Sequence, residues 1–195
     1  MFHAAMLSPT KIFGGSAIVL LGLSSARPAH ALLTVGPEVG IVKRSADAPA
    51  NLKLGVAYGA RAEVSLLPLI NFGPYYLHYQ LGVDAPSGAD AVFNVVGLRA
   101  RLTLPVPGTI KPYAFAGAGY TWVNYTAGGA GDQGGRFLEI PIGVGVAYQV
   151  LEIFQFSLDG ALRPGAAFGG DAFDKAGISK PAGGWSVLLG AALDL

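Results

Sequence analysis

Large apolar side chains stand at every second position along most of this chain. Between residues 137 and 148 the even positions carry leucine, isoleucine, valine or tyrosine, and glutamate, proline, glycine or alanine stands between them. After residues 149–151 a second run, 154–163, alternates in a similar way. Successive side chains of a β-strand point to opposite faces, so each run predicts a strand with one apolar face. The short connection between the runs predicts an antiparallel hairpin.

The alternation recurs along the whole chain and predicts eight strands. They cover residues 33–43, 52–64, 71–81, 92–104, 110–123, 137–148, 154–163 and 185–195. In these runs bulky apolar residues share one face, and glycine, alanine or charged residues share the other. Pro37, Pro112 and Pro141 lie within three of the runs, where a closed sheet offers no free edge to accommodate a proline.

Two runs carry bulky residues on both faces. In the run 71–81 we assign the apolar face to Tyr75, Leu77, Tyr79 and Leu81. His78 is then expected on the opposite face. In the run 110–123, Tyr120 and Trp122 define the apolar face, which puts Tyr113 and Phe115 on the polar one. Either a β-bulge or aromatic packing inside the sheet would explain that placement.

The composition decides which way these faces point. Of the 195 residues, 52% are hydrophobic and 13% are charged, whereas a soluble domain has about 25% charged residues. Beyond residue 25 no run approaches the ~20 apolar residues of a membrane-spanning helix. Bulky side chains would overfill the bore of an eight-stranded barrel, whereas lipid can cover them from outside. The sequence therefore predicts an all-β fold, an eight-stranded antiparallel up-and-down transmembrane β-barrel with its bulky face outward.

The connections between the predicted strands alternate in length. Those at 65–70, 105–109 and 149–151 are short, and those at 44–51, 82–91, 124–136 and 164–183 are longer. Short turns on one side and longer loops on the other are typical of outer-membrane barrels. An aromatic girdle is expected at each rim, formed by Tyr120, Trp122 and Trp185 at the loop side and by Tyr75 and Tyr148 at the turn side.

Residues 1–31 have the features of a signal peptide. Lys11 precedes a short apolar segment, and the tripeptide at 29–31, Ala-His-Ala, has the small-x-small pattern of a signal peptidase site. We therefore divide the chain into a signal peptide, 1–31, and a barrel domain, 32–195. Without Lys11 and Arg27 the 12 acidic residues outnumber the basic ones by one, which argues against nucleic acid as a partner. The absence of cysteine suits an oxidising periplasm.

The strand count, the loop asymmetry, the segment KPYAFAGAGYTW at 111–122 and the amphipathic last run together indicate a family. Over Leu33 to Leu195 the chain resembles the small eight-stranded outer-membrane barrels of the OmpA and OmpX type. The resemblance implies a place in the bacterial outer membrane, with membrane lipid and the outer-membrane insertion machinery as partners. We expect a monomer.

Charged residues on the inward face are expected to form a paired network, because a buried charge without a partner costs several kcal/mol. The predicted network consists of Glu38, Lys53, Arg61, Glu63, Arg99, Arg101, Glu139, Asp159 and Arg163. Lys111 also falls on this face. Such a network predicts a plugged, rigid lumen. A gated path for water or ions through the same residues is the alternative.

The sequence favours a structural or adhesive role in the outer membrane. A low-conductance pore or small transport barrel is the alternative, and a lipid A-modifying enzyme is a second one. Such an enzyme would place a histidine, a serine and a carboxylate near the outer rim on the lipid side. Because His78 is expected to face inward and no motif of these enzymes surrounds it, we predict no catalytic residue. We also predict no cofactor and no metal site.

Overall fold

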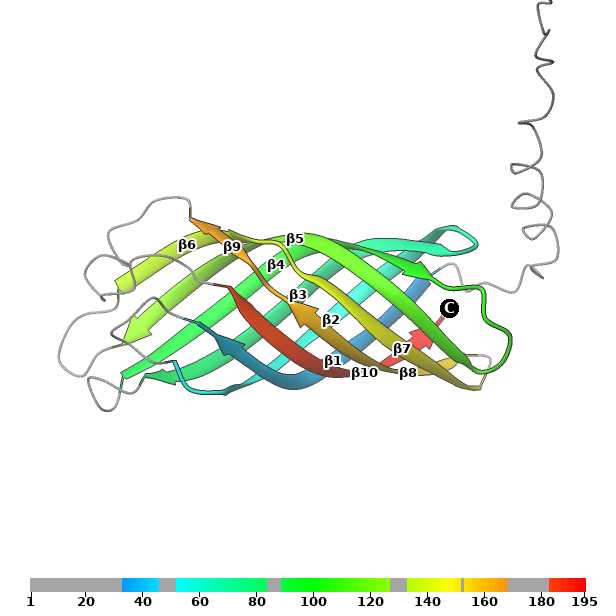
Figure 1. Ribbon diagram of the computed structural model, residues 1–195, viewed down its shortest axis with the longest axis horizontal. Coiled ribbons are helices and arrows are strands. Elements are labelled where there is room, and N and C mark those ends of the chain that lie inside the picture. The colour runs from blue at the N-terminus through cyan, green and yellow to red at the C-terminus, as the bar shows by residue number, and fades with distance from the viewer. Residues whose placement is uncertain (1–32, 46–51, 84–88, 127–132, 152, 168–182) are drawn as a thin grey trace, which may run out of the picture.

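In a computed structural model, ten antiparallel strands form one sheet that curls into a barrel (Figure 1). The structure describes residues 33–45, 52–83, 89–126, 133–151, 153–167 and 183–195. The strands are β1 (Leu33–Arg44), β2 (Gly55–Leu67), β3 (Ile70–Val83), β4 (Ala89–Thr103), β5 (Ile110–Thr126), β6 (Gln133–Glu139), β7 (Ile142–Leu151), β8 (Phe154–Leu162), β9 (Gly165–Ala167) and β10 (Gly184–Asp194). Across these ranges no helix is long and apolar enough to cross a membrane.

Two barrel strands are each divided in two by a proline. Pro141 divides the predicted strand 137–148, whereas Pro164 follows the predicted strand 154–163, and β9 lies in the segment 164–183 that was predicted to be a loop. β5 pairs with β6 along its later half and with β7 along its earlier half, so β6 and β7 form one barrel strand interrupted at Pro141. β8 and β9 are likewise separated at Pro164. Backbone bonds cross both interruptions, because Gly117 N donates to Pro141 O and Ile140 N donates to Pro164 O, each at 2.9 Å. The ten strands therefore build eight barrel strands, and the predicted fold class is confirmed.

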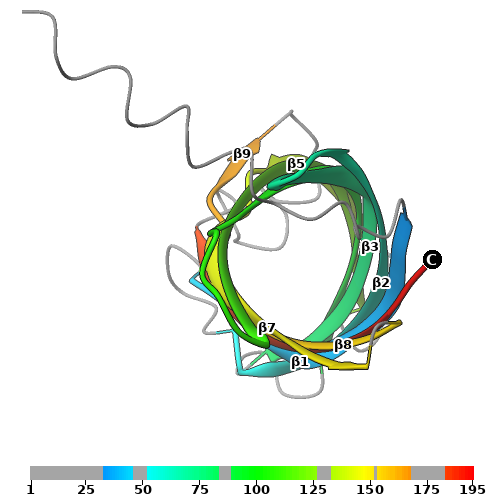
Figure 2. The ribbon, with the colours of Figure 1, turned by 90° about the vertical axis from the view of Figure 1, so that its right-hand side faces the viewer.

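The sheet closes on itself because β1 pairs with both β2 and β10 (Figure 2). The strand register gives the number of residues by which the sheet is offset when it closes. Starting from Leu33, the paired residues around the barrel are Val64, Phe72, Ala100, Ala116, Ile142, Leu162, Trp185 and Lys43. The path returns to β1 ten residues further along, at Lys43 rather than at Leu33. This offset, the shear of the barrel, requires the strands to tilt.

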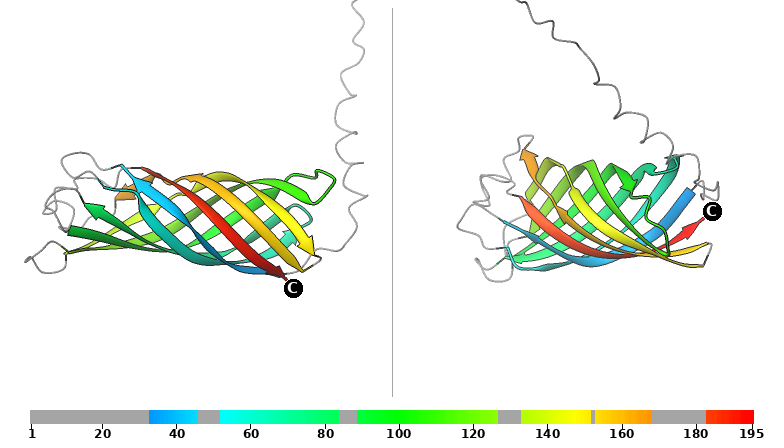
Figure 3. Two further views of the ribbon diagram at one scale, coloured as in Figure 1. Left: turned by 90° about the horizontal axis from the view of Figure 1, so that it is seen from below. Right: turned by 45° about the vertical axis from the view of Figure 1, so that its right-hand side comes forward.

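The short connections and the C-terminus lie at one end of the barrel, which we call the turn end (Figures 1 and 3). The opposite end, where the four longer connections begin and finish, is the loop end. The turn between β4 and β5 contains Gly108 with a φ of 108°, a left-handed conformation that glycine adopts without strain. In the same turn Lys111 Nζ donates to Val106 O at 2.9 Å. Lys111 is thus tied to the turn, not to the charges inside.

The predicted faces hold for most strands, and the bulky face points outward. Val144 and Leu162 are each 67% exposed on the outer surface, whereas Arg99 is 5% exposed inside. The prediction for β3 was wrong. Tyr75, Leu77, Tyr79 and Leu81 all point into the lumen and are at most 6% exposed. His78 instead points outward, beside Tyr58 of β2. Since β3 has bulky residues on both faces, periodicity did not fix its orientation, which follows from its register with β2 and β4.

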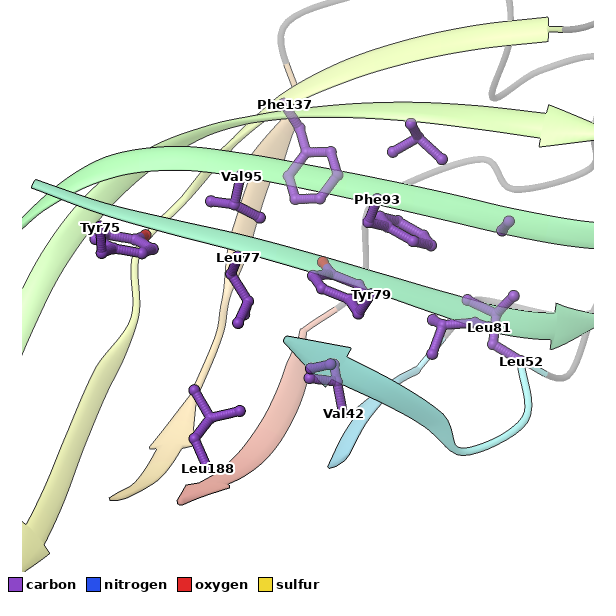
Figure 4. Packing of buried hydrophobic residues seen from close by; sticks show 13 residues of the cluster. Val42, Leu52, Tyr75, Leu77, Tyr79, Leu81, Phe93, Val95, Phe137 and Leu188 are labelled. Atoms are coloured by element: carbon purple, nitrogen blue, oxygen red, sulfur yellow. The ribbon is translucent and has the colours of Figure 1, made fainter. Parts of the chain in front are cut away.

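The loop-end half of the lumen is filled by an apolar core (Figure 4). We call these residues the lumen core: Val42, Leu52, Ala57, Tyr75, Leu77, Tyr79, Leu81, Ala91, Phe93, Val95, Val123, Phe137 and Leu188. A second, smaller group nearer the turn end contains Tyr113 and Phe115. The pairing of β5 with β4 continues through both positions without a register shift, so lumen packing and not a bulge explains them.

Candidate functional site: two charge clusters inside the barrel

Six charged residues from four strands meet in what we call the central charge cluster. They are Glu38, Arg61, Glu63, Arg99, Arg101 and Asp159, and each is at most 5% exposed. They lie on β1, β2, β4 and β8, at inward positions where the alternation placed them. Three arginines face three carboxylates, so the cluster is formally neutral.

Arg99 is the centre of this cluster. Its Nη2 atom lies 2.8 Å from Glu63 Oε1 and 3.4 Å from Glu38 Oε1, and its Nη1 atom lies 3.2 Å from Asp159 Oδ2. Arg61 is paired with Glu38 and lies 3.4 Å from Asp159. Arg99 thereby joins three acids from three different strands.

Neutral and aromatic side chains complete the central charge cluster. Arg61 Nη2 donates to Ser157 Oγ at 2.9 Å, and Tyr113 OH donates to Asp159. The guanidinium carbon of Arg99 lies 5.0 Å from the ring centre of Phe115. These contacts offset the loss of water around buried charges, which ion pairing alone often does not.

A second group, which we call the loop-end charge cluster, contains Arg44, Glu139 and Arg163. Glu139 is paired with both arginines and is 0% exposed. Arg163 Nε also donates to Ser186 Oγ at 2.8 Å, and Arg44 Nε donates to Tyr79 OH at 2.6 Å. Two cations and one anion leave this cluster with a formal charge of +1.

Aromatic rings surround the guanidinium of Arg44. Its carbon lies 4.6 Å from the ring centre of Phe137, 5.4 Å from that of Phe93 and 5.5 Å from that of Tyr79. The π faces attract the excess positive charge. Figure 4 shows these three rings converging inside the lumen core.

The structure brings together eight of the nine residues of the predicted network. The exception is Lys53, which is exposed and precedes β2. Arg44 was missed because it was assigned to a loop, although it continues the inward alternation of Glu38 and Val42. Tyr79 was missed because β3 was placed the wrong way round.

The predicted girdle residues lie outward with one exception. Tyr120, Tyr148 and Trp185 are 44%, 50% and 38% exposed. Trp122 is half-buried, with its ring centre 6.3 Å from that of Tyr120. Tyr75, in contrast, is 6% exposed and belongs to the lumen core, so its assignment to the turn-side girdle was wrong.

The environment of His78 also differs from the expectation of a lumen histidine. Its Nδ1 atom lies 2.8 Å from Asn94 Oδ1, and its ring centre lies 4.6 Å from that of Tyr58. These neighbours are on the outer surface. Neither is a serine or a carboxylate, the partners that an esterase-like histidine requires. Residues 1–32, with the predicted signal peptide, lie outside the described part of the chain.

A closed antiparallel barrel of eight strands, apolar outside and charged inside, is the fold of the small outer-membrane β-barrel proteins. No model of a known protein family and no curated protein matches this sequence.

Solved structures share the fold. Neisserial surface protein A is 15% identical, with a TM-score of 0.63 over 84% of this chain and 97% of that one. The N-terminal barrel of Pseudomonas aeruginosa OprF is 18% identical, with a TM-score of 0.54 over 82% and 96%. Ail, the attachment invasion locus protein of Yersinia pestis, is 12% identical, with a TM-score of 0.53 over 83% and 95%. At these identities the likeness describes the fold.

Proposed function

We propose that this chain is a bacterial outer-membrane protein with a structural or adhesive role, and that its barrel does not conduct solutes. The observation that carries the proposal is the filled lumen. In a water-filled channel the inward side chains would be accessible to water, yet Leu77, Tyr79, Val95 and Phe137 are at most 1% exposed. We expect no enzymatic activity.

Two barriers lie in series along the barrel axis. The lumen core fills the loop-end half, and the central charge cluster ties four strands together nearer the turn end. An ion would have to displace packed aromatic rings and then break several buried ion pairs. Either step alone is costly, because close-packed interiors resist rearrangement.

The adhesive part of the proposal draws on one similar fold. Ail is described as an attachment invasion locus protein, and it has been solved with the heparin analogue sucrose octasulfate. A sealed barrel that presents its longer connections at one end is a suitable scaffold for surface contacts of that kind.

The experiment is single-channel recording of the refolded protein in planar bilayers. We expect no conductance from the wild type. We also expect none from Arg99→Ala or from the double variant Leu77→Ala/Phe93→Ala, because each of these variants leaves one barrier in place. The triple combination should show discrete conductance steps. Heat-modifiable migration in gels checks that every variant is folded.

Conductance steps in the folded wild type would contradict the sealed barrel and favour the pore. For the role itself, cells with and without the protein are compared for resistance to detergent and for binding to heparin-coated surfaces. A change in the first readout supports a structural role, and a change in the second supports an adhesive one. No change in either would contradict the proposed role.

A further inference from the structure

Polar and aromatic residues form a continuous row across the outer surface of β2 to β6. Tyr58 is paired with His78, His78 with Asn94, Asn94 with Trp122, and Trp122 with Arg136. We call these five residues the outer row. Each occupies an outward position on its strand, and Arg136 and Tyr58 are exposed. The row runs near the loop end of the barrel.

Hydrogen bonds organise the middle of the outer row. Asn94 Oδ1 accepts from Tyr76 OH at 2.9 Å and lies 2.8 Å from His78 Nδ1. Since the amide oxygen is an acceptor, Nδ1 of His78 carries the proton in this contact. The oxygen of Asn94 is thereby engaged, and its NH₂ group remains a donor toward the surroundings. The imidazole ring is held against Tyr58.

The outer row differs from the outer surface of β7 and β8. The outward positions of those two strands are largely apolar, as at Val144 and Leu162, each 67% exposed. An amide, an imidazole and a guanidinium are costly in hydrocarbon. Together with tyrosine and tryptophan they fit the level of the lipid headgroups.

The charge of the outer row is complementary to an anion. Arg136 supplies a cation, and Trp122 and Asn94 supply N–H donors. The carboxylates Glu38, Glu63, Glu139 and Asp159 are buried inside the barrel. Among described residues the exposed acid on this side is Asp90, four positions beyond Asn94 toward the loop end of β4.

We propose that the outer row binds the phosphate headgroup of an anionic membrane lipid, with Arg136 pairing with the phosphate and with Trp122 and Asn94 donating hydrogen bonds. Tyr76 and His78 hold Asn94 in place and act as positioning residues. The inference rests on the proposed membrane location. It specifies the class of lipid that is bound and the side of the barrel that binds it.

The test uses bromine quenching of tryptophan in bilayers of phosphatidylcholine that contain phosphatidylglycerol. The chain has 2 tryptophans, so Trp185→Phe leaves Trp122 as the reporter of the outer row. The acyl chains of either lipid are brominated in turn. We expect phosphatidylglycerol to be enriched about fivefold next to Trp122, the factor given by one favourable surface charge.

Lys43 provides a matched control. It is an exposed cation whose strand partner is Trp185, just as Trp122 is the strand partner of Arg136. Arg136→Gln should abolish the enrichment next to Trp122, and Asn94→Leu should reduce it. Lys43→Gln should leave it unchanged.

Equal quenching by the two lipids next to Trp122 would overturn the proposal. An equal loss in Arg136→Gln and Lys43→Gln would also overturn it, because it would indicate a general surface charge effect. A protein that fails to insert into bilayers would contradict the proposed function as well. An inserted, heat-modifiable protein without enrichment would contradict the lipid site alone.

Discussion

At the scale of single residues, burial makes the stability of the barrel depend strongly on each charged residue inside it. Glu139 is 0% exposed and is the acid that both Arg44 and Arg163 contact in the loop-end charge cluster. Its neutralisation would leave two arginines facing each other inside the barrel. Removal of one arginine, in contrast, would leave a neutral pair.

We therefore expect Glu139→Gln to destabilise the barrel by about 3–5 kcal/mol, the cost of leaving a buried charge unpaired. Arg44→Met should cost less, about 1–2 kcal/mol, because Arg163 still pairs with Glu139 and methionine packs well among aromatic rings. Urea unfolding in lipid vesicles, followed by tryptophan fluorescence, measures both. An equal or larger cost for Arg44→Met would contradict this account of the cluster.

At the scale of the strands, prolines decide where hydrogen bonding is interrupted. Pro141 and Pro164 lack the N–H group that a central strand donates. Their carbonyl oxygens nevertheless accept bonds from Gly117 and Ile140, so neighbouring strands stay connected beside each interruption. Pro37 and Pro112 lie inside β1 and β5 without dividing them. A proline in a closed sheet thus removes one donor without opening the barrel.

This continuity predicts slow amide exchange beside the interruptions. The amides of Gly117 and Ile140 should exchange with deuterium more than about a hundredfold slower than that of Val106. Val106 N makes a bond of similar length, 2.8 Å, but in the exposed turn before β5. Exchange-detected nuclear magnetic resonance on the refolded protein compares the three. Similar rates at Ile140 and Val106 would mean that the barrel opens at Pro141 and Pro164.

At the scale of the strands, the sequence predicted the number and position of the barrel strands, but not the orientation of every strand. Alternation located all eight barrel strands, because one face of most strands is small or charged and the other is bulky. It failed for β3, because bulky side chains stand on both faces of this strand and the sequence did not determine which face points into the lumen. One face carries Tyr75, Leu77, Tyr79 and Leu81, and the other carries Tyr76, His78 and Gln80. The prediction also ended the first strand at residue 43, because a charged residue after an apolar run resembles the start of a loop. Arg44 was therefore assigned to the loop. Which charges share a cluster depends on register and shear, and these follow from pairing between distant strands.

At the scale of the whole molecule, closure depends on the pairing of β1 with β10. Val39 of β1 is paired with Leu189 of β10, and both side chains point outward, 53% and 58% exposed. The chain contains no cysteine. A disulfide introduced at this pair would therefore form without competing thiols.

We expect Val39→Cys/Leu189→Cys to form a disulfide on mild oxidation of the folded protein, since paired strand residues lie within bridging distance. The oxidised form should unfold at a higher temperature, because the bridge closes a long loop. Val39→Cys/Val144→Cys is the control, with Val144 on β7, a strand that does not pair with β1. Cross-linking of the control pair and not of the test pair would contradict the closed register.

The pairing of β1 with β10 joins segments that are far apart in the chain, and this has a kinetic consequence. Until β10 is in place the growing sheet has two unpaired edges, and such edges template pairing with other chains. The edge of β1 can then pair either with β10 of the same chain or with a strand of another chain. Substitutions along β1 or β10 should therefore reduce the yield of inserted protein through aggregation, even where the finished barrel is as stable as before.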